Sequence, residues 1–142
     1  MKSGGIEGAG GYQFVKTLAV PSSDIDEMGH VNNVAYLRYV EAAAREHSES
    51  VGLDIERYRE LGGVFVVRKH TVVYHRPARL GETLDLRTRV VASAGVRATR
   101  EVHIYRGEEL LVEASTDWVW VDPESYRPKR IPAEIHAALP PV

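Results

Sequence analysis

The chain has one stretch that can form a long helix, and this stretch limits the folds open to it. Over residues 33–51, apolar side chains recur at helical spacing, at Leu37, Val40, Ala44 and Val51. The charged side chains fall mostly on the opposite face. This pattern predicts one long amphipathic helix, with Asn32 or Asn33 as its N-cap and Gly52 at its C-terminal end.

Most of the remaining sequence is typical of β-strands, because it is rich in Val, Thr, Tyr and Trp between turn signals. A short helix is expected over residues 53–61. The tail, residues 127–142, contains four prolines and is expected to wrap the surface. The predicted strands are Tyr12 to Val20, Val64 to Arg76, Thr83 to Ser93, Val96 to Arg106 and Leu110 to Asp122.

These elements predict an α+β fold. Five antiparallel strands form one sheet, and its apolar face needs a cover that only the long helix can supply. We therefore expect the sheet to curl around a central helix in a single domain over residues 12–142. Residues 1–11 contain five glycines and are interpreted as a flexible leader.

Composition and charge exclude several classes of protein. With 18 basic and 20 acidic residues the net charge is −2, so no overall field would attract nucleic acid or an anionic membrane. The absence of cysteine excludes a thiol nucleophile, a disulfide framework and a Cys-ligated metal. No apolar run reaches the roughly 18 residues that a membrane span needs. A cytoplasmic location is expected.

Polar residues gather in the loop before the long helix. The segment DIDEMGHVNNVAYLRYVEAAAR, residues 24–45, resembles the signature of hot-dog-fold thioesterases. It is similar to the 4-hydroxybenzoyl-CoA thioesterase-like family, to bacterial acyl-CoA thioesterases and to plant acyl-acyl carrier protein (ACP) thioesterases. The resemblance continues through VVYHRPARLGETLDLRTRVV, residues 72–91, and RPKRIP, residues 127–132. It implies a hot-dog fold and hydrolysis of an acyl-CoA or acyl-ACP thioester, without metal or cofactor.

The resemblance also assigns roles to residues of the loop. The catalytic aspartate of the family falls on Asp26, and the residue whose backbone N–H polarises the thioester carbonyl falls on Asn33. His30 corresponds to a catalytic histidine of the plant branch, and Asn32 is taken with it as a supporting residue. Met28 stands where the plant branch has asparagine, so the chemistry is assigned mainly to Asp26.

The residues themselves favour the same chemistry. The first turn of a helix carries unsatisfied N–H groups and a partial positive charge, which suit a developing oxyanion. Asp26 can attack the thioester directly or act as a general base for water. Asp24 is interpreted as a turn residue that bonds nearby backbone. Glu41 is expected to pair with Arg45.

Several residues of this chain have a plain structural interpretation beside a functional one. His30 can be a packed loop residue, and Asn32 and Asn33 can be simple helix caps. Arg68 and Lys69, and the tail cluster Arg127, Lys129 and Arg130, can be solvated strand or surface residues. Alternatively, these cations bind the phosphates of coenzyme A.

The strand over residues 64–76 is long and apolar, and its free edge is expected to pair with a second copy. A homodimer, or a tetramer of two dimers, is therefore predicted. Two alternatives to a thioesterase remain. A hot-dog dehydratase would use a histidine with a helical acid, and the aspartate before GHVNN argues against it. The second alternative is a non-catalytic acyl-CoA-binding or sensing module, since a fold does not determine an activity.

Overall fold

A computed structural model describes residues 11–142 of the chain. The predicted leader, residues 1–11, therefore lies outside the described residues except for Gly11. The elements are β1 (Phe14–Ala19), a 3-10 turn (Ser22–Asp24), α1 (Asn33–Ser50), α2 (Ile55–Glu60), β2 (Val64–Tyr74), β3 (Thr83–Ala94), β4 (Arg97–Arg106), β5 (Glu109–Val121) and α3 (Ala133–Ala138).

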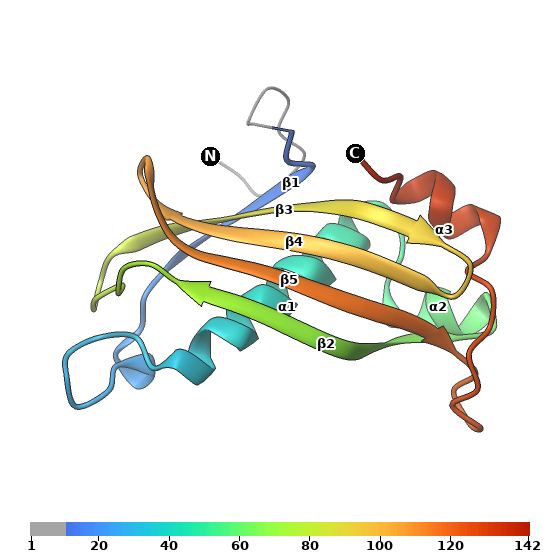
Figure 1. Cartoon of the computed structure of the whole chain (residues 1–142), viewed down its shortest axis with the longest axis horizontal. Helices are drawn as coiled ribbons and strands as arrows, with labels where there is room; N and C mark the ends of the chain where they lie inside the picture. The colour runs from blue at the N-terminus through green and yellow to red at the C-terminus, as the bar shows by residue number, and fades with distance from the viewer. Residues whose placement is uncertain (1–10) are drawn as a thin grey trace.

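The five strands form one antiparallel sheet in the order β1-β3-β4-β5-β2. Figure 1 shows α1 running along one face of this sheet, with the loop that precedes α1 at one end and α2 and α3 at the other. The predicted α+β architecture, with one long helix covering the sheet, is thus confirmed. β1 and β2 are the two edge strands.

The main core lies between α1 and the sheet. Tyr36, Val40 and Ala43 of α1 are buried in one cluster with Leu86 of β3 and Ile104 of β4. A second cluster lies under α2 and α3, and its buried members are Leu53, Val90, Trp120, Ile131, Ile135 and Leu139. The first cluster contains buried residues of α1, whereas the buried members of the second come from outside α1.

Local signals explain the limits of α1. The side chain of Asn32 accepts a hydrogen bond from the N–H of Val34 at 2.8 Å, which makes Asn32 the N-cap. Gly52 follows the helix with a φ of +86°, a conformation that side chains with a Cβ rarely adopt. Both ends agree with the prediction to within one residue.

The tail corrects one expectation. Residues 127–142 do not simply wrap the surface, because α3 forms there and buries Ile135, while Leu139 is buried just after it. Both side chains pack in the second cluster, so the tail completes the core. Within residues 11–142, no helix combines the length and the apolar character that crossing a membrane requires.

Candidate active site

Asp24 anchors the loop before α1 to the helix. Its carboxylate is 6% exposed and accepts hydrogen bonds from Arg38 Nη2 at 2.6 Å and from the Tyr39 hydroxyl at 2.5 Å. The hydrogen bonds from Tyr39 and Arg38 lower the pKa of Asp24 below its usual value. The interpretation of Asp24 as a turn residue that bonds nearby backbone is therefore wrong: its carboxylate joins the loop to α1.

Asp26 lies at the exposed tip of this loop. Its Oδ1 atom accepts from the backbone N–H of Met28 at 2.9 Å and of His30 at 3.2 Å. Gly29, with a φ of +79°, closes the turn by donating to the Asp26 carbonyl at 3.1 Å. The Oδ2 atom of Asp26 has no hydrogen-bond partner among residues 11–142. The loop thus fixes the carboxylate through one oxygen and leaves the other open to solvent.

The entrance of α1 separates the roles of the two asparagines. Asn32 supplies the hydrogen-bond acceptors for two backbone N–H groups of the first turn. Its side chain accepts from the N–H of Val34, and its carbonyl accepts from the N–H of Ala35 at 2.9 Å. The N–H of Asn33 has no acceptor in the described part of the chain. Asn33 therefore presents an unused donor at the positive end of an 18-residue helix.

His30 contributes to the loop through its backbone. Its N–H holds Asp26, and it forms a β-bridge with Arg79. The next residue, Val31, donates to the Ala78 carbonyl at 2.9 Å, so the loop docks on the segment before β3. The His30 ring makes no hydrogen bond with the described residues.

The structure does not bring Arg68 and Lys69 to this loop within one chain. The C-terminal residue of β2, Tyr74, reaches α1 by donating its hydroxyl to the Asn33 carbonyl at 3.3 Å. Lys69 lies five residues earlier on β2, about 17 Å away along the strand. Arg68 occupies a β-bulge beside it, and both residues are exposed.

Glu41 pairs with a residue of β2 and not with a residue of its own helix. Its Oε2 atom lies 3.4 Å from Nε2 of His70 on β2, so the expected pairing with Arg45 is wrong. The other ring nitrogen of His70 shares a hydrogen bond of 2.8 Å with the Thr116 hydroxyl. This contact brings a helical acid and a histidine together between α1 and β2.

Sequence reasoning overlooked Arg100. In β4 the residues facing α1 alternate, and Arg100 lies on that face between Ala98 and Val102. Its side chain is 5% exposed and reaches His47 of α1. A charged residue at an apolar position of an alternating strand is the sequence signal that could have revealed it.

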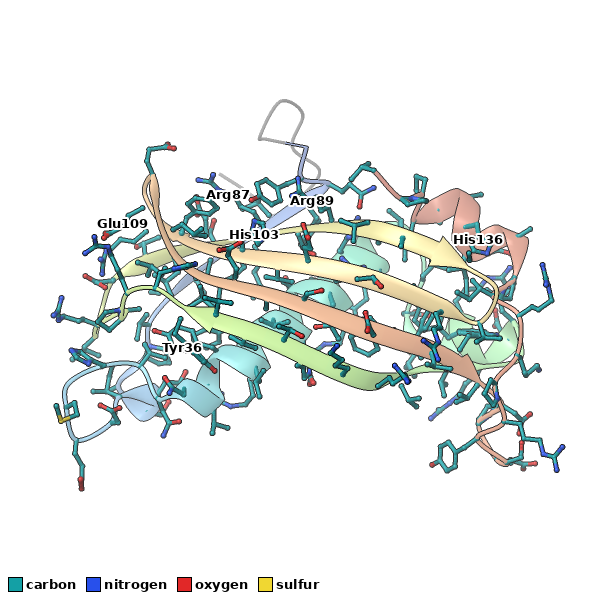
Figure 2. The ribbon with its side chains drawn as sticks, viewed as in Figure 1. Tyr36, Arg87, Arg89, His103, Glu109 and His136 are labelled. Atoms are coloured by element: carbon teal, nitrogen blue, oxygen red, sulfur yellow. The ribbon has the colours of Figure 1, made fainter. Side chains whose placement is uncertain are left out.

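A cavity of about 260 Å³ adjoins Arg100, at the opposite end of α1 from Asp26. It lies between the C-terminal half of α1, the sheet, α2 and α3. Figure 2 shows the two ends of the molecule, with Tyr36 near the start of α1 and His136 on α3. The loop that carries Asp26 and the cavity are therefore separate features.

Comparison with known proteins gives consistent matches. The family described as the thioesterase-like superfamily matches residues 20–139. The acyl-CoA thioester hydrolase YbgC of Escherichia coli O157:H7 is 34% identical over 120 residues, which cover 80% of this chain and 86% of YbgC. The chloroplastic acyl-acyl carrier protein thioesterase ATL2 of Arabidopsis thaliana is 29% identical over 135 residues, which cover 94% of this chain and 71% of ATL2.

Solved structures match as well. A probable thioesterase from Bartonella henselae superposes with a TM-score of 0.78 at 28% identity, over 83% of this chain and 98% of that one. A 1,4-dihydroxy-2-naphthoyl-CoA thioesterase from Synechocystis has a TM-score of 0.81 at 19% identity, over 89% of this chain and 94% of that one, and this likeness concerns the fold.

Proposed function

The chain belongs to the thioesterase-like superfamily, and on this basis we propose that it hydrolyses an acyl or aryl thioester of coenzyme A or of acyl carrier protein. The products are the free acid and the thiol. The similarity to YbgC and to ATL2 supports this reaction class. Asp26 and Asn33 are the residues that we assign to the chemistry.

One observation carries the assignment. The exposed carboxylate of Asp26 stands on a loop that leads into α1, and the N–H of Asn33 at the start of α1 has no acceptor among the described residues. A thioester whose carbonyl oxygen accepts from Asn33 gains a donor where negative charge develops. The helix dipole acts in the same direction.

The reaction has two possible first steps. As a general base, Asp26 takes a proton from water while the hydroxide adds to the carbonyl carbon; the C–S bond then breaks and the thiolate takes up the proton. As a nucleophile, Asp26 displaces the thiolate to form a mixed anhydride, which water hydrolyses. In both, the N–H of Asn33 stabilises the oxyanion.

The remaining loop residues have supporting roles. Asn32 keeps the first turn of α1 in place by capping Val34, and the backbone N–H of His30 orients Asp26. Arg68 and Lys69, or the tail cluster Arg127, Lys129 and Arg130, supply cations for the phosphates of coenzyme A. No metal or cofactor takes part in the proposed steps.

The proposed active unit is a homodimer, or a tetramer of two dimers. Asp26 is exposed in the single chain, and Arg68 and Lys69 lie far from it on the edge strand β2. Pairing of β2 with its copy about a two-fold axis would let one subunit supply Asp26 and Asn33 and the other supply Arg68 or Lys69. A cytoplasmic location, with neither nucleic acid nor membrane as a partner, stays a prediction.

The assay is release of free thiol from a panel of acyl- and aryl-CoA substrates, with and without chelator. Asp26→Asn is expected to lower kcat by about 100-fold or more, because the amide can neither take up a proton nor attack. Glu27→Gln is the matched control, since it neutralises the neighbouring exposed carboxylate. If the two variants lose activity equally, Asp26 is not the catalytic base or nucleophile. Tight acyl-CoA binding without thiol release would favour a sensing module.

The contact between Glu41 and His70 keeps a second candidate open. A hot-dog dehydratase needs a histidine and a helical acid, and these two residues meet at 3.4 Å. Glu41→Gln tests this reading in the same assay and in an enoyl-CoA hydration assay. Hydration that depends on Glu41, without thiol release, would favour the dehydratase.

A further inference from the structure

The cavity at the C-terminal end of α1 is not used by the proposed thioester chemistry. Its volume is about 260 Å³, and apolar side chains such as Leu53, Phe65 and Leu139 form much of its wall. The liquid volume per water molecule is ~30 Å³, so the cavity has room for roughly nine heavy atoms. Such a space suits a small apolar molecule.

A buried cation faces this cavity without a counter-ion. The guanidinium of Arg100 makes its hydrogen bonds through Nη1, to His47 Nδ1 at 2.8 Å and to the Thr88 hydroxyl at 3.0 Å. Because Arg is only a donor, the His47 ring is a neutral acceptor. The Nε and Nη2 groups of Arg100 have no partner within residues 11–142. No carboxylate of the described chain pairs with Arg100.

Trp118, in the same wall, carries a buried donor that is unsatisfied. The Nε1 atom of Trp118 is buried and is the one buried side-chain nitrogen or oxygen in residues 11–142 without a hydrogen-bond partner. Ala98 of β4 pairs with Trp118 of β5, and Arg100 pairs with Thr116, so the two donors lie two positions apart on the same face of the sheet. The unmade hydrogen bond of the buried indole N–H is costly, but that atom has almost no surface open to the cavity. The Nε and Nη2 groups of Arg100 are not among the buried unpaired atoms, so an acceptor in the cavity can reach them.

The acidic residues of the cavity lie at its mouth. Glu49 and Asp54 are exposed, and Asp54 is engaged as the N-cap of α2, accepting from the N–H of Arg57 at 2.7 Å. Glu41 faces His70. Arg45, also at the mouth, carries the opposite charge. Solvent screens these exposed charges, whereas the charge on Arg100 lies in the apolar interior.

We propose that this cavity binds an amphipathic carboxylate, with the carboxylate on Arg100 and the hydrocarbon part against the apolar wall. A carboxylate offers two acceptor oxygens, which match the fork of Nε and Nη2 in Arg100. The expected ligand has about seven or eight carbons, because a carboxylate of that length has nine or ten heavy atoms and the cavity holds roughly nine. Binding of a free acid needs no thioester hydrolysis, so this proposal is independent of Asp26.

The first experiment is calorimetric titration of the full chain with octanoate and with 1-octanol at pH 7. The two probes share the hydrocarbon chain and differ in the charged group. We expect octanoate to bind at least 10-fold more tightly, with one site per chain, because a hydrogen bond to a charged group contributes more than a neutral one. Equal affinities, or no octanoate binding, would overturn the proposal.

Variants then test Arg100 as the donor. Arg100→Met is expected to weaken octanoate binding by roughly 10- to 150-fold and 1-octanol binding by less than about 3-fold. Trp118→Phe keeps an aromatic wall and removes an indole N–H that is closed off from the cavity, so binding is expected to change by less than about 3-fold. Arg97→Met, on the exposed part of the same strand, is the matched control and should leave binding unchanged. Unchanged octanoate binding in folded Arg100→Met, or an equal loss in Arg97→Met, would contradict the site.

The carboxylate can belong to a free acid or to the far end of an acyl group. Kinetics with octanoyl-CoA and with the mono-CoA thioester of an eight-carbon dicarboxylic acid distinguish the two sources. A KM that rises in Arg100→Met for the dicarboxylic thioester alone would assign the site to the acyl group. Octanoate binding with unchanged KM values would assign it to the free acid. Absence of both effects would overturn the proposal, whether or not Asp26 proves catalytic.

Discussion

The imidazole of His47 and the guanidinium of Arg100 form a buried pair that joins α1 to β4. The His47 ring also stacks on Phe14 of β1, with ring centroids 5.4 Å apart. Burial, and then the positive charge of Arg100, lower the pKa of His47 to about 3. Burial also lowers the pKa of Arg100, to about 10. The fold therefore requires His47 to be neutral.

This requirement makes the stability of the protein depend on pH. The unfolded chain binds a proton at His47 below about pH 6.5, whereas the folded chain does not until about pH 3. Stability is thus complete above pH 6.5 and is lost as the pH falls through this window. At pH 5 the expected loss from His47 is about 2 kcal/mol relative to pH 7.

Urea unfolding at pH 7 and pH 5 measures this loss. In His47→Gln the amide oxygen can still accept from Arg100 but does not titrate, so the pH-dependent loss should shrink by most of that amount. His136→Gln is the control, because the ring of His136 is partly exposed on α3. An equal pH dependence in wild type and His47→Gln would contradict the assignment.

The two aspartates of the loop have different roles that the sequence alone does not distinguish. Asp24 and Asp26 are the same residue type two positions apart, yet Asp24 is buried against Arg38 and Tyr39 and Asp26 is exposed. The distinction depends on how the loop folds back on a helix that begins only at residue 33. The resemblance to a family indicated Asp26, whereas composition and spacing alone could not separate the pair.

Among the elements, α1 and α3 differ in what determines them. The limits of α1 follow from local signals, Asn32 at one end and Gly52 at the other, and they were predictable. α3 has six residues between prolines, too few for a recognisable apolar period. Its helical form depends on the burial of Ile135 and Leu139 in the second cluster, which involves residues distant in sequence.

A substitution of Ile135 tests whether α3 depends on the burial of its apolar side chains. Ile135→Ala is expected to lower the free energy of unfolding by about 2 to 4 kcal/mol, because the lost side chain leaves a void under α3. Ile55→Ala, at an isoleucine that is 52% exposed, should have a much smaller effect. Denaturant melts of both variants measure the difference. A change below about 0.5 kcal/mol for Ile135 would mean that α3 does not complete the core.

For the whole molecule, the free edge of β2 is the feature that bears on how subunits assemble. This strand is eleven residues long, and Val67, Val73 and Tyr74 leave large apolar surfaces exposed on it. Such an edge invites pairing with a second chain. The sequence indicated this strand from its length and apolar character, but neither sequence nor a single chain determines the number of subunits.

Subunit mixing tests the shared site. Asp26→Asn and the double variant Arg68→Glu, Lys69→Glu are each expected to be inactive as pure proteins. After reversible unfolding and refolding together, random pairing should restore about a quarter of the wild-type activity, because half of the dimers are hybrids with one intact site of two. No recovery from well-folded mixtures, or a fully active monomer by light scattering, would contradict the shared site.

The ion pair and hydrogen bond of Asp24 have a consequence for how the enzyme responds to temperature. Asp24 fastens the loop to Arg38 and Tyr39. The conformational entropy of the loop that carries Asp26 is therefore lost once, when the chain folds, and not again in each catalytic cycle. Releasing that anchor would leave the reacting groups chemically unchanged but would require the loop to be ordered at every turnover. The activation entropy of hydrolysis would then become more negative, so a group remote from the bond that breaks would govern the entropic part of its barrier.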